Sequence, residues 1–432
     1  MKLTVSYGVN EKGHFTAGEV DVVDLAKQYG TPLYVLNEDD IRKHCRRFKD
    51  AIEECYDGNG LPLYASKAFS CKEMYRIINE EGLGADVVSG GELYTALNAG
   101  FPASKIFFHG NNKTADELDF AMKSNVGRVV VDNMRELSML DSAAAKYGQT
   151  AKILLRIKPG VDAHTHDFIK TGQIDSKFGF AIETNEAIEA VRAALGFKNI
   201  ELCGMHCHIG SQIFDTAPFH EAANVMMGFL LEIKGKFNVE MTELNLGGGF
   251  GIRYKEDDTP VTYREYMVGV SKIIKNFCTE NNYSVPRIYV EPGRGIAAPG
   301  SMTLYTVGSV KTIPDVRTYV AVDGGMPDNP RYILYGAEYE VVVANKADKP
   351  RDFKATIAGK CCESGDLLAE NVMIQKPESD DILAVLATGA YNYSMASNYN
   401  RIPRPAVVMV KGDSSRVVVR RESYEDLIKN DL

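Results

Sequence analysis

Eight short apolar segments that alternate with helix-like stretches are the feature of this 432-residue sequence that most constrains its fold. The segments begin near residues 61, 84, 105, 128, 151, 200, 242 and 287. Stretches with the composition of helices, such as 134–148 and 262–282, lie between them. Strand and helix in alternation predict an α/β fold with a parallel sheet, and eight strands are the number that closes a (β/α)8 TIM-type barrel. An open doubly wound sheet is the alternative.

The pattern changes after about residue 300. Segments such as VRTYVAVDGG and DILAVLATG are rich in β-branched residues and end in turn residues, which indicates strands joined by tight turns. We therefore expect a barrel over 33–295, with 1–32 and 296–432 forming a mostly antiparallel β-barrel or sandwich domain. The segment PLYVLN at 32–37 lies outside the eight-strand count and also suits the β domain.

Composition excludes several classes of protein. The net charge of −9 argues against a nucleic-acid partner or an anionic membrane surface. No segment approaches the roughly 18 apolar residues of a membrane-spanning helix, and the first residues lack the apolar region of a secretion signal. The eight cysteines are sparse and contain no CxxC pair, so we expect free thiols. The chain is predicted to be cytoplasmic.

Distinctive polar and glycine residues collect where seven of the eight predicted strands end. They are Lys67, Asp86, His109, Arg156, His206, His208, Gly247, Gly248, Gly249, Glu291 and Arg294. The carboxyl ends of the strands of a (β/α)8 barrel form one rim, and active sites are built there. The sequence therefore predicts an active site at this rim.

Two of these features suggest a cofactor. The glycines of GGGFG at 247–251 allow close approach of a phosphate to backbone N–H groups, although a plain turn would also explain them. The next strand ends in EPGRG, which adds Arg294. Lys67 alone reads as a surface lysine, but beside a phosphate site its amine is a Schiff-base candidate. Pyridoxal 5′-phosphate, a phosphorylated aldehyde, satisfies both requirements.

Glu291 and the HCH segment at 206–208 have two interpretations each. A carboxylate that holds the pyridine nitrogen protonated makes the ring an electron sink, but Glu291 could simply pair with an arginine of the barrel. His206 and His208 share one strand face, as metal ligands would. No third ligand has a recognisable spacing, so we expect no metal and favour stacking of an imidazole on the cofactor ring.

The segment CCESGD at 361–366 lies in the predicted β domain. A buried thiol in a turn would explain it. The functional interpretation is a thiol that donates a proton beside a carboxylate that receives the substrate, and the residues alone leave both open.

The motifs YASKA, HCHIGSQ, GGGFG, EPGRG, CES and GAYNYSM occur in the order found in fold-type III pyridoxal-phosphate decarboxylases, which the chain resembles from Pro32 to Asn400. Within this family it is most similar to the decarboxylases that act on diaminopimelate. The segments that support this narrower resemblance are RIKPGVDAHTH at 156–166, SKFGF at 176–180 and NPRYILYG at 329–336.

The resemblance implies a role for individual residues. Lys67 would hold the cofactor and Cys362 would return the proton. The further cofactor contacts implied are Asp86, His208, Ser211, Gly247, Gly248, Gly249, Glu291, Gly293, Arg294 and Tyr391. The substrate contacts implied are Arg294, Arg331, Tyr335, Glu363 and Tyr391, with Glu363 receiving the far amino group.

The resemblance further implies decarboxylation of meso-2,6-diaminopimelate to L-lysine by a homodimer in which Cys362 and Glu363 enter the partner's site. A decarboxylase of ornithine, arginine or carboxynorspermidine is the alternative, although those substrates give Arg331 less purpose. A racemase would need a second base in place of Cys362. A silent regulatory homologue would not need Lys67, Glu291 and Cys362 together.

Overall fold

The computed structural model describes residues 7–161 and 176–432 and divides into two compact units. The barrel unit comprises His44–Ile252 and Thr259–Gly293, and the β unit comprises Met1–Lys43, Arg253–Asp258 and Arg294–Leu432. Helix α2 (Glu38–Tyr56) carries the chain from the β unit into the barrel unit.

Eight parallel strands close into a barrel, which confirms the predicted (β/α)8 fold. In barrel order they are β5 (Gly60–Ala65), β6 (Gly84–Val87), β7 (Ile106–Phe108), β8 (Arg128–Val131), β9 (Ala151–Lys158), β11 (Ile200–His206), β12 (Glu243–Asn245) and β13 (Arg287–Val290). The pairing of β13 with β5 closes the ring, and a short strand β10 (Phe180–Ala181) pairs with β9 beside it. The open-sheet alternative is wrong.

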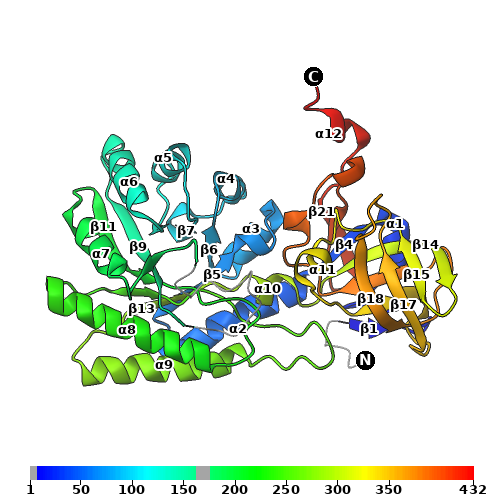
Figure 1. Ribbon diagram of the computed structural model, residues 1–432, viewed down its shortest axis with the longest axis horizontal. Coiled ribbons are helices and arrows are strands. Elements are labelled where there is room, and N and C mark those ends of the chain that lie inside the picture. Colours follow the sequence, from blue (N-terminus) through cyan, green and yellow to red (C-terminus); the bar gives the residue numbers. More distant parts are fainter. Residues whose placement is uncertain (1–6, 162–175) are drawn as a thin grey trace. The chain divides into compact units, whose positions relative to one another are not determined.

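Helices follow the barrel strands and lie around them (Figure 1). They are α3 (Lys72–Glu80), α4 (Gly90–Asn98), α5 (Ala115–Lys123), α6 (Met134–Lys146), α7 (Glu186–Gly196), α8 (Ala217–Phe237) and α9 (Tyr263–Glu280). Several begin at capping residues. Thr114 and Thr262 each accept a backbone N–H in the first turn, and Glu117 and Glu265 complete the capping boxes. Local sequence therefore sets where these helices start.

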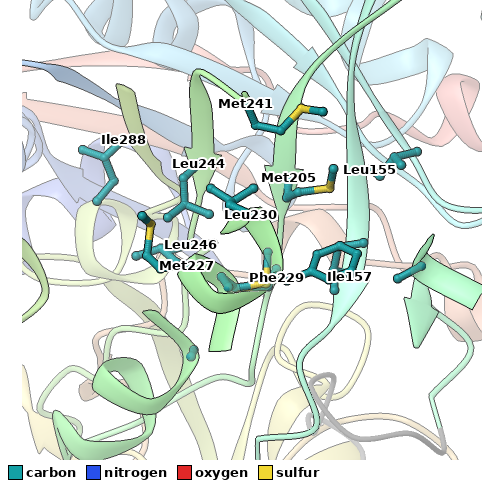
Figure 2. Packing of buried hydrophobic residues seen from close by; sticks show 14 of the residues in the cluster. Leu155, Ile157, Met205, Met227, Phe229, Leu230, Met241, Leu244, Leu246 and Ile288 are labelled. Carbon is teal, nitrogen blue, oxygen red and sulfur yellow. The ribbon is translucent and has the colours of Figure 1, made fainter. Parts of the chain in front are cut away.

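Alternation along the strands separates two apolar cores. Leu63, Phe107 and Leu154 belong to a cluster inside the barrel, because side chains of a strand point to opposite faces. The neighbouring residues on the same strands face the helices. Figure 2 shows part of this outer core, in which Leu155 and Met205 pack with residues such as Leu230 of α8. Both faces of the sheet are buried, as a parallel barrel requires.

The β unit is built on a mixed sheet with the order β18-β17-β15-β14-β4-β20-β21, and β19 joins it by pairing with β14. The strands are β4 (Leu33–Asn37), β14 (Met302–Ile313), β15 (Arg317–Val322), β16 (Val341–Val343), β17 (Phe353–Ala358), β18 (Leu367–Ile374), β19 (Ile382–Leu386), β20 (Ala406–Lys411) and β21 (Ser414–Val419). Six of its eight strand pairings are antiparallel, in agreement with the prediction of a mostly antiparallel domain. The pairings β15–β17 and β4–β20 are parallel.

Shorter elements complete the β unit. They are β1 (Tyr7–Val9), β2 (Phe15–Ala17), β3 (Val20–Asp21), and helices α1 (Val22–Tyr29), α10 (Arg294–Ala297), α11 (Arg331–Tyr335) and α12 (Tyr424–Ile428). Leu33 and Val35 of β4 lie in the same apolar cluster as Phe15 and Leu304. Within the described ranges no helix is long and apolar enough to cross a membrane. All eight cysteines are free thiols.

A buried carboxylate anchors the start of α2 within the β unit. The side chain of Glu38 is 2 % exposed and pairs with Arg42 at 2.8 Å, with Lys411 at 3.0 Å and with Arg416. Burial would raise the pKa of Glu38, but hydrogen bonds from these three cations lower it to about 2. The charge of Glu38 therefore joins α2 to β20 and β21.

We expect Glu38→Gln to lower the free energy of unfolding by about 3 kcal/mol at pH 7, because three cations lose one buried partner. Since the folded-state pKa lies below the ordinary value, this contribution is fully present above about pH 4.5 and is lost as the pH falls toward 2. Urea denaturation at several pH values measures both effects.

Glu54 on the same helix provides the control. Its bond to Arg264 is 2.9 Å long, but more than half of each side chain is exposed. Glu54→Gln should change stability by less than about 0.5 kcal/mol. Equal losses for the two variants would contradict the anchoring role of Glu38.

Candidate active site

The carboxylate of Glu291 is a buried group at the barrel rim on which several strand ends converge. It follows β13 and is 8 % exposed. Asn245, at the end of β12, donates to Oε1 at 2.7 Å. The Nε2 atom of His109, just after β7, lies 3.0 Å from Oε1, and Nε2 of His206, the last residue of β11, lies 3.3 Å from Oε2. Four strand ends thus converge on one carboxylate.

The electrostatics of this cluster favour an ionised Glu291. Burial would raise the pKa of Glu291, but the charges and hydrogen bonds of His109 and His206 hold it well below its usual range. Burial lowers the pKa of His206 to about 4. Burial would also lower the pKa of His109, yet the charges of Glu291 and Asp86 raise it. Glu291 and His109 therefore form a buried ion pair.

Lys67 and Asp86 also lie at strand ends. Lys67 is exposed and sits in a single 3-10 turn (Ser66–Ala68) directly after β5. The hydroxyl of Tyr64 donates to the carbonyl of Phe69 at 2.9 Å and so spans this turn. Asp86 is the penultimate residue of β6, and burial raises its pKa to about 6 against the opposing charge of His109. Within the described residues its buried Oδ1 atom accepts no hydrogen bond.

The glycine triplet packs closely against the neighbouring strand ends. A Cβ on Gly248 would lie 2.2 Å from the carbonyl oxygen of Glu291, and one on Gly249 would lie 2.5 Å from that of Gly210. Gly247 and Gly249 have positive φ angles of 69° and 107°. Only glycine fits this geometry.

Hydrogen bonds connect the triplet to the loop that follows β11. Gly247 N–H donates to Oδ1 of Asn245 at 2.9 Å, and Gly248 N–H donates to Nδ1 of His208 at 3.1 Å. The second bond requires the unprotonated form of Nδ1. Burial and the nearby charges of Lys67 and Arg156 accordingly lower the pKa of His208 well below its usual range.

Ser211 and Gly293 complete the predicted rim positions in the barrel unit. Ser211 lies in the loop after β11, where Ile213 N–H donates to Gly249 O at 3.0 Å and binds this loop to the glycine loop. A Cβ on Gly293 would lie 3.0 Å from that of Ala65 at the end of β5. Ser211 and Gly293 therefore both lie in loops that pack against the ends of neighbouring barrel strands.

Arg156 at the rim is held by an aromatic ring. It is 9 % exposed, and its guanidinium lies 4.1 Å from the ring centroid of Phe178 in the SKFGF motif. Gly179 N–H donates to Asp132 at 2.8 Å. Residues 162–166 of the RIKPGVDAHTH motif lie outside the described residues.

In the β unit, four predicted residues form one cluster of arginine and tyrosine side chains. The ring of Tyr391 lies 4.8 Å from the guanidinium of Arg294 and 4.9 Å from that of Arg331. Arg331 also lies 5.0 Å from the ring of Tyr335. Nε of Arg331 is buried without a hydrogen-bond partner among the described residues. This cluster is suited to bind a carboxylate, which pairs with guanidinium groups in a planar, bidentate manner.

Sequence reasoning missed two residues of these clusters. Asn245 ends β12 two residues before the first glycine of the triplet, and the strand-end rule would have found it. The hydroxyl of Tyr254 accepts a hydrogen bond of 2.6 Å from Nη1 of Arg294. The centroid of its ring lies 5.6 Å from the guanidinium carbon of Arg294. Forty residues separate the two, and no local signal identifies Tyr254.

Cys362 and Glu363 lie between β17 and β18 in the β unit, and both side chains are exposed. Cys361, next to them, is half-buried. The neighbouring cysteines therefore differ in accessibility.

The barrel rim fits pyridoxal 5′-phosphate. An exposed amine at Lys67, an unpartnered buried oxygen on Asp86 and a glycine loop that admits no Cβ are the groups that such a cofactor requires. A carboxylate has about four acceptor positions, and Glu291 has three neighbouring donors, which leaves room for a protonated ring nitrogen. The ligand atoms of His109, His206 and Glu291 also lie within 4.8 Å of one another, a spacing that a metal ion could use.

Comparison with known proteins defines the class. Residues 38–298 match the family "Pyridoxal-dependent decarboxylase, pyridoxal binding domain". The chain therefore belongs to the pyridoxal-dependent decarboxylases, and its cofactor is pyridoxal phosphate.

More specific relatives carry one name. The chain is 51 % identical to a diaminopimelate decarboxylase of Bacillus methanolicus over 96 % of both chains. It is also similar to the diaminopimelate decarboxylase of M. jannaschii solved with L-lysine, with a TM-score of 0.90, 34 % identity and coverage of 99 % and 98 %. Within its class the chain belongs to the diaminopimelate decarboxylase family.

A more distant structure shares the fold alone. The lysine/ornithine decarboxylase of Vibrio vulnificus solved with putrescine has a TM-score of 0.76 at 21 % identity, with coverage of 90 % and 97 %. The fold is thus compatible with more than one amino-acid substrate, and side chains must decide between them.

We expect Gly248→Ala to weaken pyridoxal phosphate binding at least about tenfold, because the new methyl group displaces the loop from Glu291. Titration of the apoenzyme with the cofactor, followed by absorbance, measures the affinity. Gly235→Ala in α8 is the control, since its Cβ would have nothing within 4 Å. Equal affinities for both variants would contradict the packing role of Gly248.

Proposed function

We propose that this chain catalyses the decarboxylation of meso-2,6-diaminopimelate to L-lysine and carbon dioxide. The observation that carries the proposal is the ionised Glu291, held by Asn245, His109 and His206 at a rim that also presents Lys67. The similarity to diaminopimelate decarboxylases extends over nearly the whole chain, which supports the choice of substrate.

The barrel residues have distinct tasks in this proposal. Lys67 would hold the cofactor through its aldehyde carbon, with release of water, and the loops with Ser211, Gly247–Gly249 and Gly293-Arg294 would hold its phosphate. When bound, pyridoxal phosphate withdraws the electron pair that the departing carboxylate leaves at the α-carbon. Glu291 keeps the proton on the ring nitrogen because its own pKa lies far below the usual range.

His208 and Asp86 complete the cofactor contacts. The ring of His208 would stack on the cofactor, and the hydrogen bond that it accepts from Gly248 N–H sets the orientation of the ring. Asp86 contributes the buried oxygen that lacks a partner among the described residues.

The β unit supplies the substrate contacts in this proposal. Arg331, with a buried Nε atom that lacks a partner among the described residues, binds a carboxylate of the substrate together with Arg294 and Tyr335. Tyr391, which contacts both guanidinium groups, orients them. Glu363 receives the distal amino group, and the Cys362 thiol returns a proton to the α-carbon.

We further propose a cytoplasmic homodimer in which the segment with Cys362 and Glu363 enters the site of the second subunit. The exposure of both side chains supports this arrangement, since neither is committed to a buried site within its own chain. Eight free thiols are typical of a reducing compartment.

The related decarboxylation of ornithine, arginine or carboxynorspermidine is the alternative. These substrates lack the distal amino-acid centre of diaminopimelate, so they would leave Arg331 without its partner. An assay of the purified enzyme with meso-diaminopimelate and with ornithine distinguishes the two. We expect lysine from diaminopimelate and no turnover of ornithine. Preferential turnover of ornithine would transfer the assignment to the alternative.

Lys67→Ala should abolish the visible absorbance of bound cofactor and lower the decarboxylation rate at least about a thousandfold, because no amine remains to hold the aldehyde. Lys72→Ala, at an exposed lysine five residues away, is the control and should leave both unchanged. Absorbance and activity that persist in Lys67→Ala would show that this mechanism is wrong.

Arg331→Ala should raise KM for diaminopimelate about 10- to 100-fold, because a buried guanidinium–carboxylate pair is lost. Steady-state kinetics measure the change. Arg317→Ala removes an arginine of the same unit that pairs with Glu370 at 2.7 Å, and its KM should match that of the unmodified enzyme. An unaltered KM in Arg331→Ala would exclude this residue from substrate binding.

A further inference from the structure

The segment that carries Cys362 and Glu363 is organised around one buried carboxylate, that of Asp366. Asp366 is 2 % exposed, although it forms no ion pair with the described part of the chain. A buried charge without a cation is costly unless hydrogen bonds compensate it. The groups that donate hydrogen bonds to the Asp366 carboxylate therefore indicate which part of the chain it holds in place.

Backbone N–H groups from two segments donate to this carboxylate. Cys361 N–H donates to Oδ2 at 2.8 Å, and Met326 N–H donates to Oδ1 at 2.6 Å. The backbone of Asp366 also takes part: Gly359 N–H donates to its carbonyl at 2.9 Å, and its own N–H donates to Glu363 O at 3.1 Å. Asp366 thus closes the segment 359–366 into a compact loop.

Two glycines make room for the Asp366 carboxylate. A Cβ on Gly359 would lie 2.1 Å from its Oδ2 atom, and one on Gly325 would lie 2.5 Å from the same atom. Neither position admits a larger residue without displacing the carboxylate. The two segments are therefore shaped around Asp366.

The loop distinguishes its two neighbouring cysteines. The thiol of Cys361 lies against Asp366, and burial together with the charge of that carboxylate raises its pKa to about 12. Cys362, the next residue, is exposed, and its N–H donates to Oδ1 of Asn400 at 2.8 Å. The two neighbouring thiols therefore differ in exposure and in the influence of Asp366.

We propose that Asp366 is a positioning residue for the reaction: it fixes the backbone of segment 359–366 so that Cys361 turns inward and Cys362 and Glu363 face outward. The inference rests on the proposed role of Cys362 as proton donor. Asn400 provides the second attachment of the loop, at the N–H of Cys362 itself.

A double-mutant cycle on the holoenzyme tests this role. Asp366→Asn should lower kcat about a hundredfold, because an N–H acceptor becomes a donor and the thiol moves. In a Cys362→Ala background the same substitution should lower kcat less than about threefold, since the group that it positions is already gone. A residue with only a structural role would lower kcat by the same factor in both backgrounds.

Asp381 provides the matched control. It is a buried carboxylate of the same unit that accepts Glu378 N–H at 2.7 Å and pairs with Lys346, away from the Cys362 loop. Asp381→Asn should have equal effects on kcat with and without Cys362.

A milder variant keeps the test valid if Asp366→Asn does not fold. Asn400→Gly removes an exposed side chain at a residue with φ of 51°, where glycine is not strained. It should lower kcat only when Cys362 is present. Asn371→Gly, at an exposed asparagine with φ of 55°, is its control.

The outcomes distinguish the role of Cys362 as proton donor from the role of Asp366 as positioning residue. If Cys362→Ala retains full activity, the proposed proton donor is wrong and the positioning role falls with it. If Cys362→Ala is impaired but Asp366→Asn lowers kcat equally in both backgrounds, the proton donor stands and the positioning role is overturned. Rapid alkylation of Cys361 in Asp366→Asn, compared with slow alkylation in the unmodified enzyme, supports the inward placement of its thiol; equal rates contradict it.

Discussion

The pairing of β13 with β5 is the interaction on which the candidate site depends. It closes the sheet and so brings the carboxyl end of the last strand beside that of the first. Glu291, His109, His206 and Asn245 come from four different strands, yet their polar atoms meet within hydrogen-bond distance. In an open sheet the edge strands would stand far apart, and this cluster would not form.

The closed barrel also stabilises a buried charge at its rim, because it brings hydrogen-bonding partners from several strands to the same carboxylate. Burial disfavours ionisation of Glu291, but the two histidines outweigh that effect, whereas Asp86, with weaker compensation, has a pKa of about 6. Two carboxylates on one rim therefore differ in pKa because their neighbours differ. That difference suits a site in which one carboxylate must stay ionised to hold a protonated ring.

The β unit uses other means to order its polar residues. The guanidinium groups of Arg294 and Arg331 both contact the ring of Tyr391, and backbone N–H groups hold the Asp366 carboxylate. Arg294 and Arg331 each begin a short helix, whereas Asp366 lies in the turn before β18, so contacts between these segments are needed to fix the side chains. Glycines at positions 325 and 359 provide the space that the Asp366 carboxylate needs.

The eight strands, their alternation with helices and the polar residues at most of the strand ends could be predicted from the sequence, because they follow from local periodicity and from the position of each residue along its own strand. The motif order also indicated the family. The tertiary structure was needed to show that Asn245 donates to Glu291, that Tyr254 accepts from Arg294, and that Cys361 is half-buried while Cys362 is exposed. Most of these contacts join residues about forty or more positions apart. They form only when the barrel closes and the mixed sheet assembles, so no local sequence pattern predicts them.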